Sequence, residues 1–85
     1  MTEKKVGIVT HFFGKISVAI IDITDEPLAV GDTIHIKGHT TDLTQKIESM
    51  QIERQNIEKA EVGQSIGLKV SARVHEQDIC YKVIE

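Results

Sequence analysis

The chain has no tryptophan, a single cysteine, a single proline and only three aromatic residues, two Phe and one Tyr. One cysteine cannot form a disulfide within the chain, and this usage is typical of a reducing compartment, so we expect a cytoplasmic protein. Because aromatic side chains are scarce, the core has to be built from Ile, Val and Leu. No N-terminal run has the apolar length of a signal peptide or a membrane span, so we expect no membrane association.

Positive charge is also in short supply, since 10 Lys and Arg stand against 13 Asp and Glu and the net charge is −3. A protein that coats nucleic acid through bulk electrostatics carries a basic surface, so this balance argues against that class and leaves room only for a local basic patch. The 85 residues, 40% of them apolar, suffice for one hydrophobic core. We expect one domain over residues 6–85, preceded by a loose charged segment at residues 1–5.

A short phrase occurs twice, as Val30-Gly31-Asp32-Thr33-Ile34 and as Val62-Gly63-Gln64-Ser65-Ile66. In each copy a glycine follows an apolar residue and supplies a backbone shape that other residues resist, and a polar residue completes the turn. A new apolar alternation begins after each copy. Two such corners in a short chain predict a small β-protein with tight turns.

Apolar alternation predicts about six strands, at residues 6–13, 16–23, 34–37, 43–54, 66–70 and 79–83. Within 43–54 the apolar positions change from odd to even, which predicts a β-bulge near Glu48-Ser49. A helix over 43–60 is the alternative, because Ile47 and Met50 would share one helical face. Strands too short to stand alone favour a closed or two-layer sheet. We therefore expect an all-β fold, a small closed six-stranded antiparallel-rich β-barrel.

The predicted strand 16–23 is apolar on both faces. One face carries Ile16, Val18 and Ile20, and the other carries Ala19, Ile21 and Ile23. We assign the first face to the core. A second apolar face then points outward, where loops or a partner have to cover it. We expect a docking surface, or weak homo-oligomerisation, around Val9, Ile21 and Ile23.

Candidate contact residues lie at the turn after the first strand and on the polar face of a later one. Phe13 and Lys15 place an aromatic ring beside a cation, a pair that suits stacking on unpaired bases and contact with phosphate. The alternative is that the ring covers the rim of the barrel. The full set of expected RNA or partner contacts is Phe13, Lys15, Lys37, His39 and Arg54.

The sequence offers no credible catalytic or metal-binding set. His35 and His39 are about 13 Å apart on an extended strand, too far to share one zinc ion, so we expect no metal site. Gly14-Lys15 is the single Gly-Lys pair, but Ile16 follows it and Val9 stands where a phosphate-binding loop needs its first glycine. Cys80 has no adjacent base to activate it. We expect no enzyme, no nucleotide and no cofactor.

The two corners also carry a resemblance to a known family. Residues 28–36 and 60–68, with Ile47 and 49–51 between them, resemble domain 2 of translational GTPases of the elongation factor Tu type, a six-stranded translation-protein barrel. The resemblance covers about residues 6–84 and is that of a stand-alone translation-elongation-factor-like protein. The same barrel is similar to C-terminal accessory domains of RNA-related enzymes, including collagenase-like peptidase relatives linked to tRNA hydroxylation.

Two functions follow from that resemblance as expectations. The first is a non-catalytic binding module that contacts tRNA, rRNA or a protein of translation or RNA modification. The alternative is a protein-interaction or assembly domain that complements a partner enzyme and makes no contact with nucleic acid. The apolar strand 16–23 favours the alternative, and the candidate basic positions favour the first.

Overall fold

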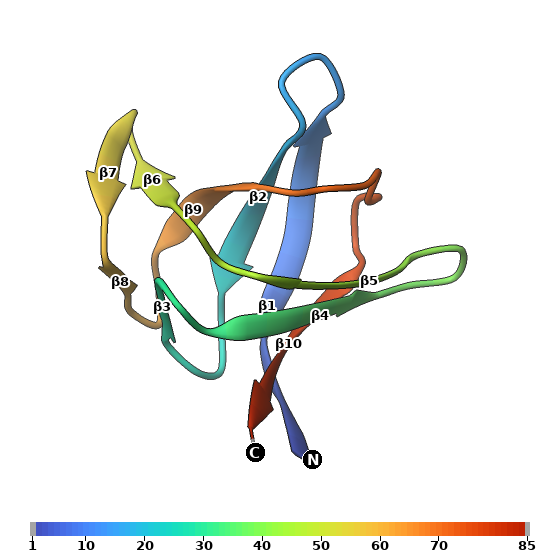
Figure 1. Cartoon of the computed structure of the whole chain (residues 1–85), viewed down its shortest axis with the longest axis horizontal. Coiled ribbons are helices and arrows are strands. Elements are labelled where there is room, and N and C mark those ends of the chain that lie inside the picture. The colour runs from blue at the N-terminus through green and yellow to red at the C-terminus, as the bar shows by residue number, and fades with distance from the viewer. Residues whose placement is uncertain (1, 85) are drawn as a thin grey trace.

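The computed structural model describes residues 2–84, which form strands and turns with no helix. The strands are β1 (Thr2–Phe13), β2 (Val18–Ile23), β3 (Leu28–Ala29), β4 (Thr33–Lys37), β5 (Asp42–Lys46), β6 (Met50–Ile52), β7 (Gln55–Ile57), β8 (Lys59–Ala60), β9 (Ser65–Lys69) and β10 (Ile79–Ile84). The large sheet has the order β5-β4-β10-β1-β2-β9-β6-β7, and β3 pairs with β8 in a small second sheet. Every pairing is antiparallel (Figure 1).

The all-β antiparallel class is thus confirmed, whereas a closed barrel of six strands is not. The large sheet has eight strands, and its order begins at β5 and ends at β7. The helix considered for 43–60 is wrong, because that stretch contains β5, β6, β7 and β8. Residues 2–5, expected to be loose, belong to β1 and pair with β10, and Met1 lies outside the described residues. Among residues 2–84 there is no helix with the length and apolar character needed to cross a membrane.

β1 is long because it serves two neighbours, β10 along its first part and β2 along its second. Its register shifts between Lys5 and Gly7 and again between Val9 and His11. Such a shift, a β-bulge or a local irregularity of the ladder, changes the face that the following side chains occupy. Val9 is therefore buried in the core together with Val6, although simple alternation places them on opposite faces.

β2 turns toward the core the face that the sequence analysis assigns to the surface. The exposed fractions of Val9, Ile21 and Ile23 are 0, 0 and 2%. The predicted docking surface is therefore wrong, because its three residues are core. Asp22 explains the orientation: its carboxylate stays at the surface, where it accepts a hydrogen bond from the hydroxyl of Ser65. A charged residue avoids the core unless it is paired, so the residues in phase with Asp22 face outward with it.

The repeated Val-Gly phrase forms two corners of the same design. Gly31 and Gly63 have φ values of 99° and 96°, in the region that favours glycine. The residues that follow them, Asp32 and Gln64, each accept a side-chain hydrogen bond from the backbone amide three residues earlier, at 2.9 and 2.7 Å. The strands that precede the corners, β3 and β8, pair with each other. The sequence repeat is therefore a structural repeat.

In the segment 43–54 the buried positions change from odd to even at the expected place. The change occurs where one strand ends and another begins, so the predicted β-bulge within a single strand is wrong. Ile47 and Met50 are both buried, and between them the chain leaves β5, paired with β4, and enters β6, paired with β9. Gln45 bridges β5 to the end of β9. Its Nε2 donates to the carbonyl of Lys69 at 2.9 Å, and its Oε1 accepts from the amide of Ser71 at 2.8 Å.

Candidate functional site

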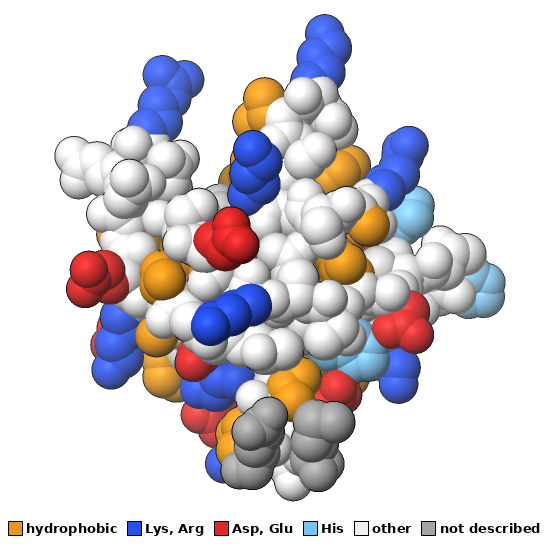
Figure 2. Space-filling view, in the orientation of Figure 1, with side chains coloured by type: hydrophobic (Ala, Val, Ile, Leu, Met, Phe, Trp, Pro, Cys, Tyr) orange, Lys and Arg blue, Asp and Glu red, His pale blue; other side chains and the backbone are white. Residues whose placement is uncertain are grey.

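An apolar strip covers the outside of β2 and β9. We call it the outer apolar face, and it is formed by Phe13, Ile16, Val18, Ile20 and Gly67. Phe13 and Ile16, in the β1–β2 hairpin, are 50% and 60% exposed, and Val18 and Ile20 are half-buried. Figure 2 shows hydrophobic side chains exposed at this hairpin, among separated Lys and Arg side chains. Isolated exposed apolar residues are ordinary, and a contiguous strip of them makes this face a candidate interaction surface.

The outer apolar face is hollowed rather than flat. Two adjoining hollows of about 400 and 190 Å³ share Ile16, Val18 and Gly67 in their lining. The absence of a side chain at Gly67 deepens the floor of the hollow. A β-carbon added there would contact Val18 Cγ1 at 3.5 Å and Ile20 Cδ1 at 3.7 Å. The larger hollow extends from Phe13 to the β6–β7 turn. The face can thus receive side chains from a partner.

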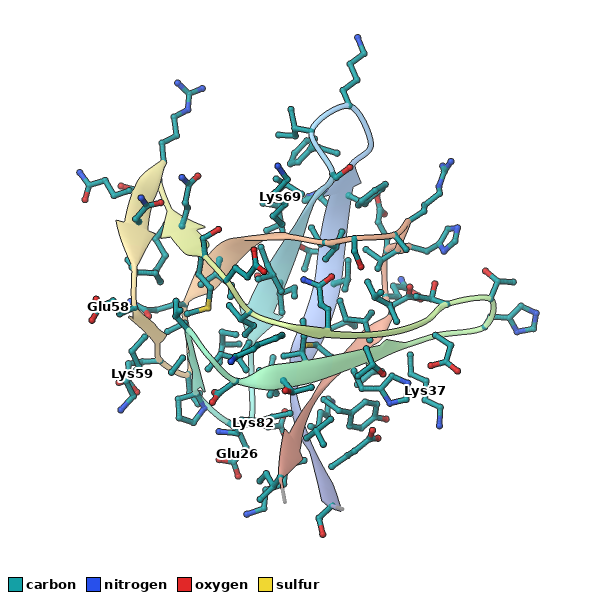
Figure 3. All side chains as sticks on the ribbon, viewed as in Figure 1. Glu26, Lys37, Glu58, Lys59, Lys69 and Lys82 are labelled. Carbon is teal, nitrogen blue, oxygen red and sulfur yellow. The ribbon has the colours of Figure 1, made fainter. Side chains whose placement is uncertain are left out.

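Two cations line the hollows of the outer apolar face, and a third lies in the adjoining hairpin turn. Lys15 stands next to Ile16 in the hairpin turn, Arg54 lines the larger hollow and Lys69 lines the smaller one. Figure 3 shows Lys69 near the β1–β2 hairpin. None of the three forms an ion pair within the described residues. Glu53 is the one carboxylate among the described residues that line the two hollows.

The turn that carries Arg54 has an unusual backbone. Ile52 pairs with Gln55, so Glu53 and Arg54 form a two-residue β-hairpin loop, with φ values of 50° and 67°. Two consecutive positive φ values define a type I′ turn, which Asn-Gly and similar pairs normally supply. Glu and Arg are disfavoured in this region. The chain therefore accepts backbone strain at the position where Arg54 reaches the hollow.

The structure brings together some of the contact residues predicted from the sequence. Phe13, Lys15 and Arg54 lie at or beside the outer apolar face. Lys37 ends β4 and His39 lies in the turn before β5, and neither lines the two hollows. Ile16, Val18, Ile20, Gly67 and Lys69 are not among the contact residues predicted from the sequence. The residue that identifies this surface in the sequence is Asp22. Its charged side chain faces outward, and the residues that alternate in step with it on β2 face outward too.

A second cluster surrounds His35. Its Nδ1 is 2.6 Å from Glu3 Oε2, its Nε2 is 2.5 Å from Asp42 Oδ1, and its side chain is 14% exposed. The hydrogen bonds to Asp42 and to Glu3 raise the pKa of His35 above its ordinary value, against an opposing effect of burial. The protonated ring donates to both carboxylates and so ties β1 and β5 to β4. Both ring nitrogens are thereby occupied.

The His35 cluster makes stability depend on pH. Because the folded-state pKa lies above the ordinary value of 6.5, the stabilisation is fully present below that pH and is lost as pH rises through the raised pKa. We expect the free energy of unfolding to fall by up to about 1 kcal/mol between about pH 6 and about pH 8, the scale of two weak ion pairs and below the pH at which the thiol of Cys80 ionises in the unfolded chain. Urea unfolding across that range checks this. His35→Gln should remove the slope, whereas His39→Gln, in the exposed turn, should keep it; a slope unchanged in His35→Gln would contradict the assignment.

A third cluster resembles a catalytic triad in its residue types but not in its geometry. Thr41 Oγ1 lies 3.0 Å from His75 Nδ1, and Asp78 Oδ2 lies 4.0 Å from the same nitrogen. A triad needs the nucleophile and the acid on opposite nitrogens. Asp78 instead accepts the backbone amide of His75 at 2.8 Å, which fixes the loop before β10. Residues 2–84 contain no group of three or more His, Cys, Asp and Glu side chains placed to hold a metal ion.

Cys80 is a core residue. Its side chain is fully buried, and burial raises its pKa to about 12. The thiolate is the reactive form of cysteine, so this thiol is inert in the folded protein.

Comparison with known proteins relates the chain to proteases. No family model matches it. It is 38% identical over 82 residues to an uncharacterized protease of Methanocaldococcus jannaschii, an alignment that covers 95% of this chain and 20% of the relative. It is 37% identical over 78 residues to a collagenase of Porphyromonas gingivalis, covering 91% of this chain and 22% of the relative. The chain therefore spans about a fifth of the length of these relatives.

The fold matches a domain of the same kind of protein. The C-terminal domain of a putative U32 peptidase from Geobacillus thermoleovorans has a TM-score of 0.86 and 20% identity, covering 93% of this chain and 91% of that one. GDP-bound aIF5B from Aeropyrum pernix has a TM-score of 0.68 and 15% identity, covering 96% of this chain and 15% of that one. The resemblance to elongation factor Tu domain 2 is therefore wrong, since the stronger matches are to proteases and a peptidase domain. The RNA-binding and translation roles implied by that resemblance are not supported.

Proposed function

We propose that the chain is a non-catalytic protein-interaction domain that docks onto and completes a larger chain of the protease kind. The observation that carries this proposal is the coverage: 91–95% of this chain aligns with only 20–22% of each curated relative. In those proteins the matching segment accompanies a chain several times longer. A domain with such a companion needs a surface that holds it in place, and the outer apolar face supplies one.

The groups that resemble catalytic ones support a non-catalytic role, because each has a structural task. Cys80 packs in the core, His35 joins three strands through two carboxylates, and Asp78 fixes the loop before β10. The free thiol of Cys80 also supports a reducing compartment such as the cytoplasm.

The platform that carries the outer apolar face is stiffened by a side chain. The two hydrogen bonds of Gln45 join β5 to the end of β9, which are not neighbours in the sheet order. We propose that this bridge makes the curled sheet behave as a closed barrel. A closed sheet has little freedom to flatten, so the outer apolar face keeps one shape for its partner.

A domain replacement tests the proposed function. We expect this chain to replace the matching segment of the Methanocaldococcus jannaschii protease, with a specific cleavage site at each junction. After cleavage the chain and the remainder should still co-elute in size-exclusion chromatography, because the interface holds them without a covalent link. A chimera that carries an unrelated β-domain of similar size is the control and should separate. Complete separation of this chain from the remainder would overturn the proposal.

A further inference from the structure

We infer that the partner covers the outer apolar face with an acidic and aliphatic protein segment, whose apolar side chains enter the hollow and whose Asp or Glu carboxylates meet Lys15, Arg54 and Lys69. This inference rests on the proposed function and specifies the chemistry of the docking contact.

The lining of the hollow selects aliphatic side chains. The apolar part of its floor and sides includes Val18, Ile20, Gly67 and Ile16, and Gln51 and Ser65 add polar groups to the lining. A surface that binds unpaired bases offers several aromatic rings for stacking. Here Phe13 is the single aromatic residue in the lining, and its ring already lies on His11, with centroids 6.4 Å apart. A protein segment therefore fits this floor better than a nucleic acid does.

The cations beside the hollows favour a partner that carries negative charge. Arg54 lines the larger hollow, Lys69 lines the smaller one, and Lys15 precedes Ile16 in the hairpin turn. The three come from different turns or strands and have no ion-pair partner within the described residues. Complementary charges around an apolar centre set the orientation and the partner choice of an interface. A second copy of this chain is a poor occupant, because a two-fold dimer through this face would bring six cations together. The weak homo-oligomerisation expected from the sequence is therefore not the use of this surface.

The β6–β7 turn supports a role for the Arg54 side chain itself. Glycine at position 54 would adopt the observed φ of 67° without strain, yet the chain has arginine there. Local strain of this kind is typical of residues whose side chain is needed in one place. Arg54→Gly is therefore a sharp probe, since it removes the cation and relaxes the backbone at the same time.

The cleaved chimera provides the test. We expect Lys69→Glu and Arg54→Gly each to weaken reassociation of the two pieces by about tenfold, and Ile16→Asp to weaken it at least as much. Arg54→Gly should leave the melting temperature of the free chain unchanged or higher, which separates docking from folding. Lys37→Glu, outside the hollows, is the matched charge control and should reassociate like the unmodified chimera.

The outcomes distinguish the inference from the proposed function. If the pieces reassociate and the three variants bind as tightly as the Lys37→Glu control, this inference is overturned and the proposed function stands. If the unmodified pieces separate completely, both are overturned. If tRNA at physiological salt displaces the remainder and binding depends on Lys15 and Arg54, the assignment of a protein segment is overturned.

Discussion

The Gly7→Ala variant is expected to lose about 3 kcal/mol or more of folding free energy, above the usual cost of overpacking a core by a methyl group. A β-carbon on Gly7 would overlap the carbonyl oxygen of Asp22 and would lie 2.8 Å from its carbonyl carbon. Both are backbone atoms of β2, in the ladder where Gly7 pairs with Ile23. A side chain could rotate away from such an overlap, but a strand in the middle of the sheet cannot move without breaking its pairs on both sides.

Urea unfolding followed by far-ultraviolet circular dichroism measures this loss. Gly14→Ala is the matched control, because the nearest atom to a β-carbon there is Phe12 Cε2, at 3.6 Å, and the position lies in the hairpin turn. The control is expected to change stability by less than about 0.5 kcal/mol. Equal stabilities of the two variants would show that β1 and β2 do not approach as closely as described.

The requirement at Gly7 is not visible in the sequence, although the requirements at Gly31 and Gly63 are. The corner glycines sit in a repeated local phrase, and local turn chemistry alone demands their positive φ. Gly7 lies within an apolar run that simply predicts a strand. Its constraint arises from the close approach of the β2 backbone at Asp22, beside a register shift in the pairing of β1 with β10. Local sequence patterns do not contain such a three-strand relationship.

One part of the candidate site can be predicted from the sequence and the other cannot, because only the first depends on local pattern. That β2 is apolar on both faces follows directly from its residues. The choice of the inner face follows from Asp22, whose charge keeps its phase outside, so the sequence contained the information needed to identify the outer apolar face. The approach of Arg54 and Lys69 to that face is different, because it depends on β6 and β9 pairing next to β2. Those pairings are long-range, and no spacing in the sequence indicates them.

The two faces of β2 allow a matched pair of substitutions with opposite expected results. Ile21→Lys is expected to unfold the protein or to leave it only part of its stability, because it places an unpaired charge at a position with 0% exposure in the core. Such a burial costs about 4 kcal/mol or more, and a chain of this length has a total stability of about 4–13 kcal/mol. Circular dichroism and a thermal melt of the variant check this. A cooperative melt near that of the unmodified protein would contradict the burial of Ile21.

Ile20→Lys, one residue away, makes the same chemical change on the outer apolar face. Its side chain is half-buried beside Gly67, so a lysine there can extend its ammonium into water while its methylenes stay on the floor. We expect a stability change of less than about 1 kcal/mol and a loss of reassociation in the cleaved chimera. The two substitutions together would show that the two apolar faces of β2 have different roles. Ile21 would be needed for folding and Ile20 for binding. A folded Ile20→Lys variant that still reassociates normally would show that the hollow is not the place where the partner docks.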